Sequence, residues 1–565
     1  MARRASNVSQ ARDATAESKS CLALADYKEA KEAFVAGITG SSIYHINIIS
    51  LVSFISLGVY GDAVLSRSRR PQSFLLDWAT LVLPVLLSIT VFAERPLLLA
   101  AMTLVAQWPL TTLVQAFLSR TKATPAAQQD NSLANARTLT TSPGRASLAS
   151  VSAYRAHMMI LTALAILAVD FPVFPRFLAK CESFGTSMMD IGVGAFVFSQ
   201  GVVSAIPILR DPKHLFAPMH LKVLSVFRKV APLFALGLVR VLLVKGTDYP
   251  EHVTEYGVHW NFFLTIAFLP LLEVLLHPLV ARVQIAVIAL AILVVHQGLL
   301  SFTSLQDFAL NAPRNDLFSM NREGIISIPG YFAIHLLGLL TGTITIPPSP
   351  GHFRRALKEV QRDLKIRHPS KSEEESDSGD EAEEQDSFLR KQQRKQPITV
   401  LGGRRDNGKV MTELFSYSLL WWFATAIMVL VKGNEAVSRR LANFPYVIWT
   451  AAYNTTALGV YQNLNSNVKK FVSTTIGKGK TLVMEPDLQE PPPPPNVARS
   501  PPLFEAINKN GLVFFLLANV MTGAVNLSMR TMYAGDTLAM TVLVVYSLVI
   551  TYVAWVFRDV RLIKI

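Results

Sequence analysis

The sequence has little charge and almost no cysteine. Only 17% of its 565 residues are Asp, Glu, Lys or Arg, whereas a soluble chain usually has about a quarter. Hydrophobic residues make up 51%, so this composition predicts a membrane protein rather than a soluble one. The two cysteines, Cys21 and Cys181, support neither a disulfide framework nor a cysteine metal site. The N-terminal stretch MARRASNVSQARDATAES lacks an apolar core, so we expect no cleaved signal peptide.

Common catalytic motifs are missing as well. The sequence contains no P-loop, no GxSxG nucleophile elbow and no dinucleotide-binding fingerprint. It also has no His-x-x-x-x-Asp pair of the glycerolipid acyltransferase kind. No short motif therefore assigns a reaction, and we expect no bound cofactor.

Long apolar runs are what the sequence has in abundance. Many approach the ~20 residues that a helix needs to cross a bilayer, whereas a membrane β-barrel would show short alternating segments. The sequence therefore predicts an all-α, polytopic membrane helix bundle with about 13 transmembrane helices. The expected spans are residues 43–60, 74–93, 96–118, 157–174, 184–207, 230–245, 257–279, 283–301, 324–346, 411–431, 442–463, 509–529 and 536–557.

Polar stretches divide these spans into groups. The loop 347–410 contains SEEESDSGDEAEEQDS between basic segments, a composition typical of disorder, and the loop 464–508 contains PPPPP, a stiff spacer. The predicted organisation is an N-terminal segment (1–42), spans one to nine (43–346), a disordered charged cytoplasmic loop (347–410), spans ten and eleven (411–463), a Pro-rich cytoplasmic loop (464–508), and spans twelve and thirteen with a C-terminal tail (509–565).

Basic residues set the expected orientation. Loops after odd-numbered spans, with the C-terminal tail, hold roughly 35 Lys and Arg, and the other loops hold roughly ten. The positive-inside rule then places the C-terminus in the cytoplasm and the N-terminus in the lumen. The same rule accounts for the net charge of +14, so we expect a lipid bilayer and no nucleic acid as partner. The chemically richest short stretches fall at the non-cytoplasmic ends, which predicts a polar site there.

One such stretch is AVDFPVFPRFLAK, residues 168–180. Asp170 ends the fourth span, and Pro172 and Pro175 prevent the helix from continuing normally. Lys180 therefore lies on a broken connector, and the chain can fold back to pair the two charges. An ionisable group near the bilayer is a functional candidate, and a carboxylate beside a cation can serve as a base. A structural ion pair at a helix mouth is the equally favoured alternative.

Further polar residues cluster at the same end of the predicted bundle. His252, Glu255 and His259 have a spacing that would suit a metal, but the motif is not HExxH. Hydrogen bonding to a polar ligand or helix capping is the favoured interpretation, and we expect no metal. Asp190 lies among small residues of span five, where it faces either a cavity or a polar neighbour.

Arginines complete the set of candidates. Arg322 would grip a phosphate or stabilise a helix start, and Arg439 and Arg440 would bind an anionic head group or anchor the interface. The other candidate polar residues lie in short segments at the ends of the predicted spans. The expected substrate-binding residues are Arg155, Asp190, His252, Glu255, His259, Asn261, Asn321, Arg322, Arg439, Arg440 and Asn443.

Long unusual motifs carry a resemblance to a known family. LTALAILAVDFPVFPRFLAK, ESFGTSMMDIGVGAFVFSQGVVS, EHVTEYGVHWNFF, NREGI, VSRRLANFPYVIW and NGLVFFLLANVMTGAVNLSM resemble the inositol acyltransferase of glycosylphosphatidylinositol (GPI) anchor synthesis, in its fungal form. The similarity runs from KEAFVAGITGSSIYHIN to the C-terminus and is sparse in the polar loops. Ala156 and His157 depart from the family, because glycines are expected there, and Arg155 is retained.

The resemblance implies a multi-pass enzyme of the endoplasmic reticulum membrane. Such an enzyme moves a fatty acyl chain, typically palmitoyl, from acyl-CoA as co-substrate to the inositol 2-hydroxyl of glucosaminyl-phosphatidylinositol. The family's proposed catalytic Asp and Lys fall on Asp170, as general base, and Lys180, as orienting or charge-stabilising partner. A transporter with a midplane charged site is the alternative, although the sequence lacks a matched pair of interrupted segments. Acyl-chain preference and oligomeric state do not follow from the sequence.

Overall fold

The computed structural model is helical throughout the residues that it describes. These are residues 30–31, 33–34, 37–65, 73–106, 149–245, 253–367, 406–433, 436–477 and 500–563. Within them, eight helices are long and apolar enough to span a bilayer, as expected for a polytopic membrane protein. They are α2 (Ile43–Leu65), α7 (Ala149–Ala168), α8 (Met188–Arg210), α13 (Ile285–Phe302), α16 (Arg322–Thr345), α19 (Asn407–Lys432), α22 (Gly511–Ser528) and α23 (Asp536–Val556).

The other expected spans differ in length or continuity, and the one expected at 96–118 is described only as far as residue 106, in an apolar helix at Pro96–Ala106. The span expected at 74–93 is split into α3 (Phe74–Leu81) and α4 (Leu83–Ser88), because Pro84 starts a new helix. The span at 257–279 shortens to α11 (Phe262–Leu275), whose N-terminus is capped by the side chain of Asn261. The spans at 230–245 and 442–463 belong to the longer helices α9 (Met219–Lys245) and α20 (Phe444–Gly477).

Two segments expected to be loops contain helices. In the predicted disordered loop, α17 (His352–Arg367) packs against α16, and the apolar side chains Phe353, Ala356, Leu357 and Val360 are buried on one face. Their i, i+3, i+4, i+7 spacing is typical of an amphipathic helix. The acidic run later in the same loop predicted disorder for the whole loop and so hid this helix. In the Pro-rich loop, α21 (Pro502–Lys509) packs on α7.

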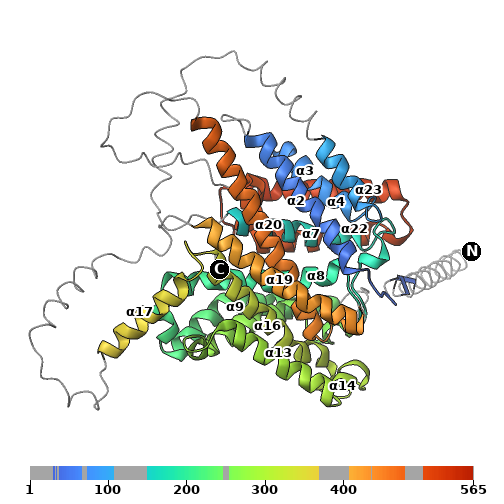
Figure 1. Cartoon of the computed structure of the whole chain (residues 1–565). Coiled ribbons are helices and arrows are strands. Elements are labelled where there is room, and N and C mark those ends of the chain that lie inside the picture. The colour runs from blue at the N-terminus through green and yellow to red at the C-terminus, as the bar shows by residue number, and fades with distance from the viewer. Residues whose placement is uncertain are drawn as a thin grey trace, which may run out of the picture.

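Helices α7, α8 and α20 occupy the middle of the molecule, between the α2–α4 group and the α9–α16 group (Figure 1). The closest packing joins α8 to α16 through glycines. A Cβ on Gly201 would lie 2.0 Å from the backbone oxygen of His335, and a Cβ on Gly338 would lie 2.2 Å from that of Phe198. Small residues allow membrane helices to approach closely, so this contact holds α8 against α16, and the N-terminus of α8 lies at the site described below.

The close approach at Gly201 is testable with a control on the same helix. Gly201→Ala forces α8 and α16 apart, so we expect a loss of about 1–3 kcal/mol in stability and a clear drop in Tm of the detergent-solubilised protein. Gly192→Ala, where a Cβ meets nothing within 4 Å, should leave Tm unchanged or raise it, because alanine favours helix. Equal effects of the two substitutions would contradict the backbone-to-backbone packing.

Candidate functional site

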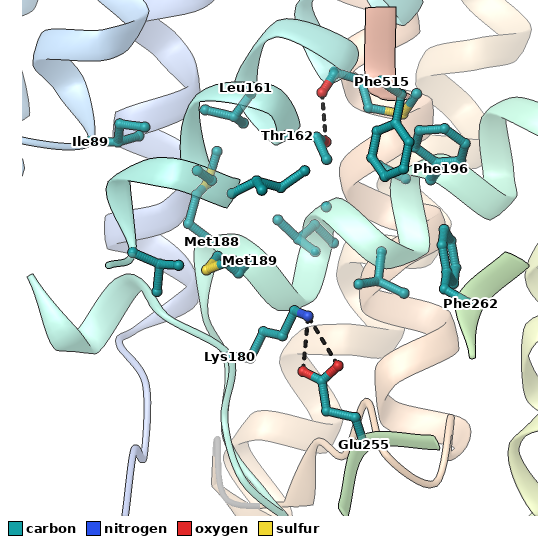
Figure 2. A pocket seen from close by; sticks show the side chains of 18 of the residues that line it. Ile89, Leu161, Thr162, Lys180, Met188, Met189, Phe196, Glu255, Phe262 and Phe515 are labelled. Carbon is teal, nitrogen blue, oxygen red and sulfur yellow. Dashed lines mark hydrogen bonds and ion pairs between the residues drawn. The ribbon is translucent and has the colours of Figure 1, made fainter. Parts of the chain in front are cut away.

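A cavity of about 370 Å³ lies among α2, α7, α8, α9, α11, α20 and α22. Most of its wall is apolar, with Met188, Met189 and Phe196 of α8 and Leu161 of α7 among the lining side chains. Figure 2 shows these residues around the cavity and Lys180 at one end of it. An apolar space of this size with a few polar groups is typical of a small-molecule site.

Lys180 projects from the connector between α7 and α8. Helix α7 ends at Ala168, and the chain then turns through Pro172 and Pro175 before α8, as the two prolines predict. The Lys180 ammonium lies 2.9 Å and 3.1 Å from the two carboxylate oxygens of Glu255 (Figure 2). Both residues line the cavity, so a charged pair stands at the border of an apolar space.

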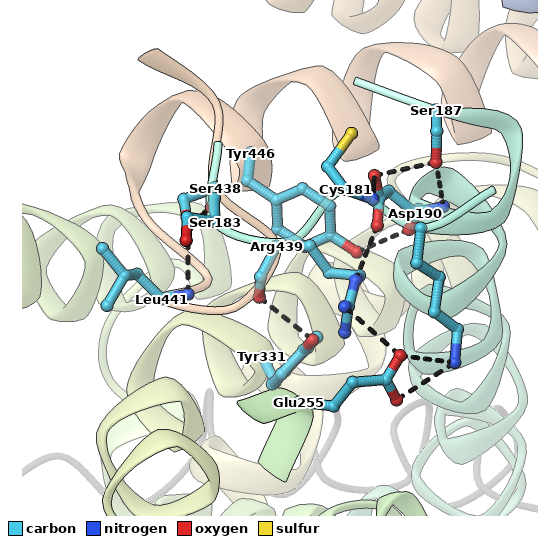
Figure 3. A network of polar contacts seen from close by, with 11 residues as sticks. Cys181, Ser183, Ser187, Asp190, Glu255, Tyr331, Ser438, Arg439, Leu441 and Tyr446 are labelled. Atoms are coloured by element: carbon cyan, nitrogen blue, oxygen red, sulfur yellow. Dashed lines mark hydrogen bonds and ion pairs between the residues drawn. The ribbon is translucent and has the colours of Figure 1, made fainter. Parts of the chain in front are cut away.

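A chain of charges holds this pair in place (Figure 3). Arg439 Nη2 lies 3.6 Å from Glu255, and Arg439 Nε donates a 2.6 Å hydrogen bond to Asp190 Oδ1. Asp190 also accepts hydrogen bonds from the Ser187 hydroxyl and the Cys181 amide. Arg439 and Asp190 are 3% and 0% exposed, so a buried ion pair anchors the charges that face the cavity.

The position of Asp190 settles the choice that the sequence left open. Its side chain faces a polar neighbour, Arg439, rather than the cavity. The thiol of Cys181 is beside it, and burial together with the nearby Asp190 charge raises the pKa of Cys181 well above its usual range. Cys181 is therefore an uncharged packing residue.

Asp170 is not paired with Lys180, contrary to the interaction that their spacing suggested. Its Oδ1 lies 3.3 Å from the Lys31 ammonium, and its Oδ2 accepts a 2.8 Å hydrogen bond from the Asn526 amide. Asp170 is 6% exposed and does not line the cavity. The two charges therefore have different partners, and Arg176, which lies between them in the sequence, binds the connector's own carbonyls.

Arg176 fixes the shape of this connector. Its Nη2 donates to the carbonyls of Val169, Phe171 and Phe174, and its guanidinium lies 4.0 Å from the ring centre of Phe34. Burial lowers the pKa of Arg176 to about 10, and the nearby Asp170 charge opposes that shift. The arginine thus remains cationic near neutral pH and satisfies the backbone that the prolines leave unpaired.

A second arginine cluster surrounds Glu323, which is fully buried. Arg314 and Arg440 bind its Oε1 at 2.5 Å and 2.8 Å. Arg322 Nε lies 3.5 Å from the same oxygen, and the Arg322 guanidinium also donates to the backbone carbonyls of Ala309, Leu310 and Ala312. The structure therefore supports the helix-start interpretation of Arg322. Its guanidinium donors are directed at backbone carbonyls, which argues against a phosphate-binding role.

The remaining expected residues divide between the cavity and the backbone. Asn261 lines the cavity, caps α11 and donates to the Gly237 carbonyl. Asn321 accepts the His259 amide, and Asn443 caps the start of α20 through the Tyr446 amide. His252 lies outside the described residues. Arg155 is half-buried on α7 and does not line the cavity.

Several cavity residues were missed by the sequence analysis. Tyr453 and Tyr461 of α20 and Ser50 of α2 line the cavity, as does His157; His157 had been noted only as a departure from the family. Asn526, the partner of Asp170, lies in the stretch GAVNLSM within α22. The sequence did contain a signal for Asn526, because a side-chain amide inside an apolar span needs a polar partner.

Comparison with known proteins shows that this chain is similar to a family of fungal proteins. A sequence model of the GWT1 family matches residues 27–557. Proteins named GPI-anchored wall transfer protein 1 are similar along nearly their whole length. That of Cryptococcus neoformans var. neoformans serotype D is 33% identical (96% of this chain, 100% of the relative), that of Yarrowia lipolytica 34% (95% and 100%), and that of Aspergillus fumigatus 36% (94% and 97%).

The buried anchor of the site gives a stability prediction. Asp190→Asn keeps the shape of the side chain but leaves the Arg439 charge without its 2.6 Å partner. Breaking a buried pair in this way costs about 3–5 kcal/mol, so we expect a large drop in Tm of the solubilised protein. The matched control is Asp406→Asn at the exposed Asp406–Lys409 pair, which should leave Tm unchanged. A Tm of Asp190→Asn equal to the wild-type value would contradict the anchoring role.

Proposed function

Because the chain belongs to the GWT1 family, we propose that it is a membrane O-acyltransferase acting in GPI-anchor biosynthesis. The family expected from the sequence motifs is confirmed, and membership gives the chain a role in GPI biosynthesis. The proposed reaction transfers a fatty acyl chain, typically palmitoyl, from acyl-CoA to the inositol 2-hydroxyl of glucosaminyl-phosphatidylinositol. The proposed location is the endoplasmic reticulum membrane.

The observation that carries the proposal is an ammonium group in the wall of an apolar cavity. Met188, Leu161 and Phe196 provide a surface suited to a fatty acyl chain. Lys180 stands beside it with its side chain 34% exposed. This combination suits a substrate with a long apolar tail and a reacting carbonyl at its head.

Lys180 is the proposed stabiliser of the transition state. An ammonium group has three N–H donors, and its contacts with the two oxygens of Glu255 use two of them. A donor therefore remains for the oxyanion that forms when the thioester carbonyl is attacked. Fixed donors at such a position typically contribute 10²–10³ in rate.

Asp170 is the proposed general base. A carboxylate offers about four acceptor positions, and the contacts with Lys31 and Asn526 occupy two. The proposal gives one of the others to the inositol hydroxyl, which must reach a side chain that is 6% exposed and lies outside the cavity lining. In the proposed step Asp170 takes the hydroxyl proton as the oxygen attacks the thioester carbonyl. The tetrahedral oxyanion then collapses, the C–S bond breaks, and the coenzyme A thiolate leaves and recovers the proton from Asp170.

Two substitutions test these roles. Asp170→Asn removes the base, and we expect the initial rate of inositol acylation in microsomes to fall by about 10²–10⁴. Lys180→Met removes the oxyanion donor and should lower the rate by about 10²–10³. Both rates are measured with acyl-CoA and glucosaminyl-phosphatidylinositol, at protein levels matched by immunoblot.

The control for the base is Asp211→Asn, at the exposed C-terminus of α8, where the side chain only accepts the Lys213 amide. This variant should retain the wild-type rate. Full turnover by Asp170→Asn, combined with loss of turnover in Glu255→Gln, would transfer the role of base to Glu255. Uptake of a solute into liposomes without consumption of acyl-CoA would overturn the acyltransferase proposal itself.

A further inference from the structure

The cavity has an exposed side and a buried side. Arg240 of α9 and Asn519 of α22 line it and are exposed at the surface. Ser50, His157 and Tyr461 also line it, and each is at most 4% exposed. The cavity is therefore open toward α9 and α22 and closed where α2, α7 and α20 meet.

Aromatic rings form the closed end. His157 Nδ1 and the Tyr461 hydroxyl share a 2.7 Å hydrogen bond, and the two rings stack with centroids 5.6 Å apart. Phe504 packs edge-on against His157 at 4.5 Å, and Phe54 packs edge-on against Tyr461 at 5.0 Å. Each ring is held by another, and close-packed interiors yield little to pressure from a ligand. This end wall is therefore rigid.

The distance to this wall suits a membrane-type acyl chain. His157 of α7 and Val169, the residue after the end of α7, both line the cavity. They are 12 positions apart, which corresponds to about 18 Å at the helical rise of 1.5 Å per residue. One leaflet of a bilayer's hydrocarbon core is about 15 Å thick, which is the depth that membrane acyl chains occupy. The cavity thus has room along α7 for one such chain, extended.

We propose that His157, Tyr461 and Phe54, the end-wall rings, set the length of the acyl chain that the protein accepts. This proposal rests on the acyl-transfer function proposed above. The thioester lies near Lys180, and the methyl end of the chain abuts the end-wall rings. A shorter chain leaves apolar wall uncovered and loses binding free energy, while a longer chain collides with rings that cannot move aside.

His157 also explains why the wall discriminates against excess length. Its Nε2 is buried and has no hydrogen-bond partner among the described residues. A methylene group in contact with that nitrogen forms no hydrogen bond with it. It also blocks any polar group that could form one. His157 is therefore a specificity residue for chain length and takes no part in the reaction.

Two substitutions at the closed end should move chain preference in opposite directions. His157→Ala removes a ring and lengthens the cavity. Ala457→Leu fills it, because Ala457 lines the cavity one helical turn from both Tyr453 and Tyr461. We expect the kcat/KM ratio for two acyl-CoAs differing by two carbons to rise about tenfold toward the longer chain in His157→Ala. It should shift by a similar factor toward the shorter chain in Ala457→Leu. About tenfold corresponds to burying roughly two methylene groups.

The measurement uses full-length protein in detergent with saturated acyl-CoAs of increasing length and glucosaminyl-phosphatidylinositol. A buried histidine away from the cavity provides the matched control: His296→Ala loses a hydrogen bond to the Leu441 carbonyl and should keep the wild-type length profile. An unchanged profile in both His157→Ala and Ala457→Leu, with turnover retained, would overturn the proposal.

A second readout separates this proposal from the function on which it rests. The rise in Tm caused by each acyl-CoA reports binding without requiring turnover. Absence of acylation by the wild-type protein, together with a length-dependent Tm profile that shifts in the variants, would reject the proposed reaction and keep the end-wall assignment. A Tm profile that does not depend on chain length would reject the end wall as a determinant of length, whatever the activity.

Discussion

The buried pair of Arg439 and Asp190 is the interaction on which the site depends. It joins the segment before α20 to the start of α8, and through Glu255 it reaches the Lys180 ammonium. Two buried charges are costly unless they are paired and hydrogen-bonded, and here the Ser187 hydroxyl and the Cys181 amide complete the shell of Asp190. The contacts that offset the cost of burying these two charges therefore also orient Lys180, which faces the cavity.

The same anchor explains why Asp170 and Lys180 have separate partners. Glu255 is held by Arg439 and presents both carboxylate oxygens to Lys180. Asp170 remains on the other side of the connector with Lys31 and Asn526. In the proposed roles, a base and an oxyanion donor that neutralised one another directly would have fewer free acceptor and donor positions for substrate. Separate partners leave each group oriented and still able to form a further hydrogen bond.

Much of this arrangement could be predicted from the sequence, and the limits have physical causes. Apolar runs and two prolines were sufficient to predict the helix bundle, the end of α7 and a polar connector. The partners of Asp170 and Lys180 are 139, 356 and 75 residues away along the chain, at Lys31, Asn526 and Glu255. Such contacts depend on helix packing, which a single sequence does not encode in any local pattern. Likewise, the sequence left phosphate binding by Arg322 open beside a helix-start role, because the backbone partners of Arg322 leave no sequence signal.

The charges behind the cavity form two separate networks. In the network that faces the cavity, the cations of Lys180 and Arg439 are balanced by the carboxylates of Glu255 and Asp190. In the other, three arginines share one carboxylate, that of Glu323, and these are Arg314, Arg322 and Arg440. Charges act more strongly where the dielectric is low, and a buried charge is costly unless it is paired. The network behind Lys180 can therefore stay buried because its charges cancel, whereas the excess of positive charge belongs to the Glu323 cluster.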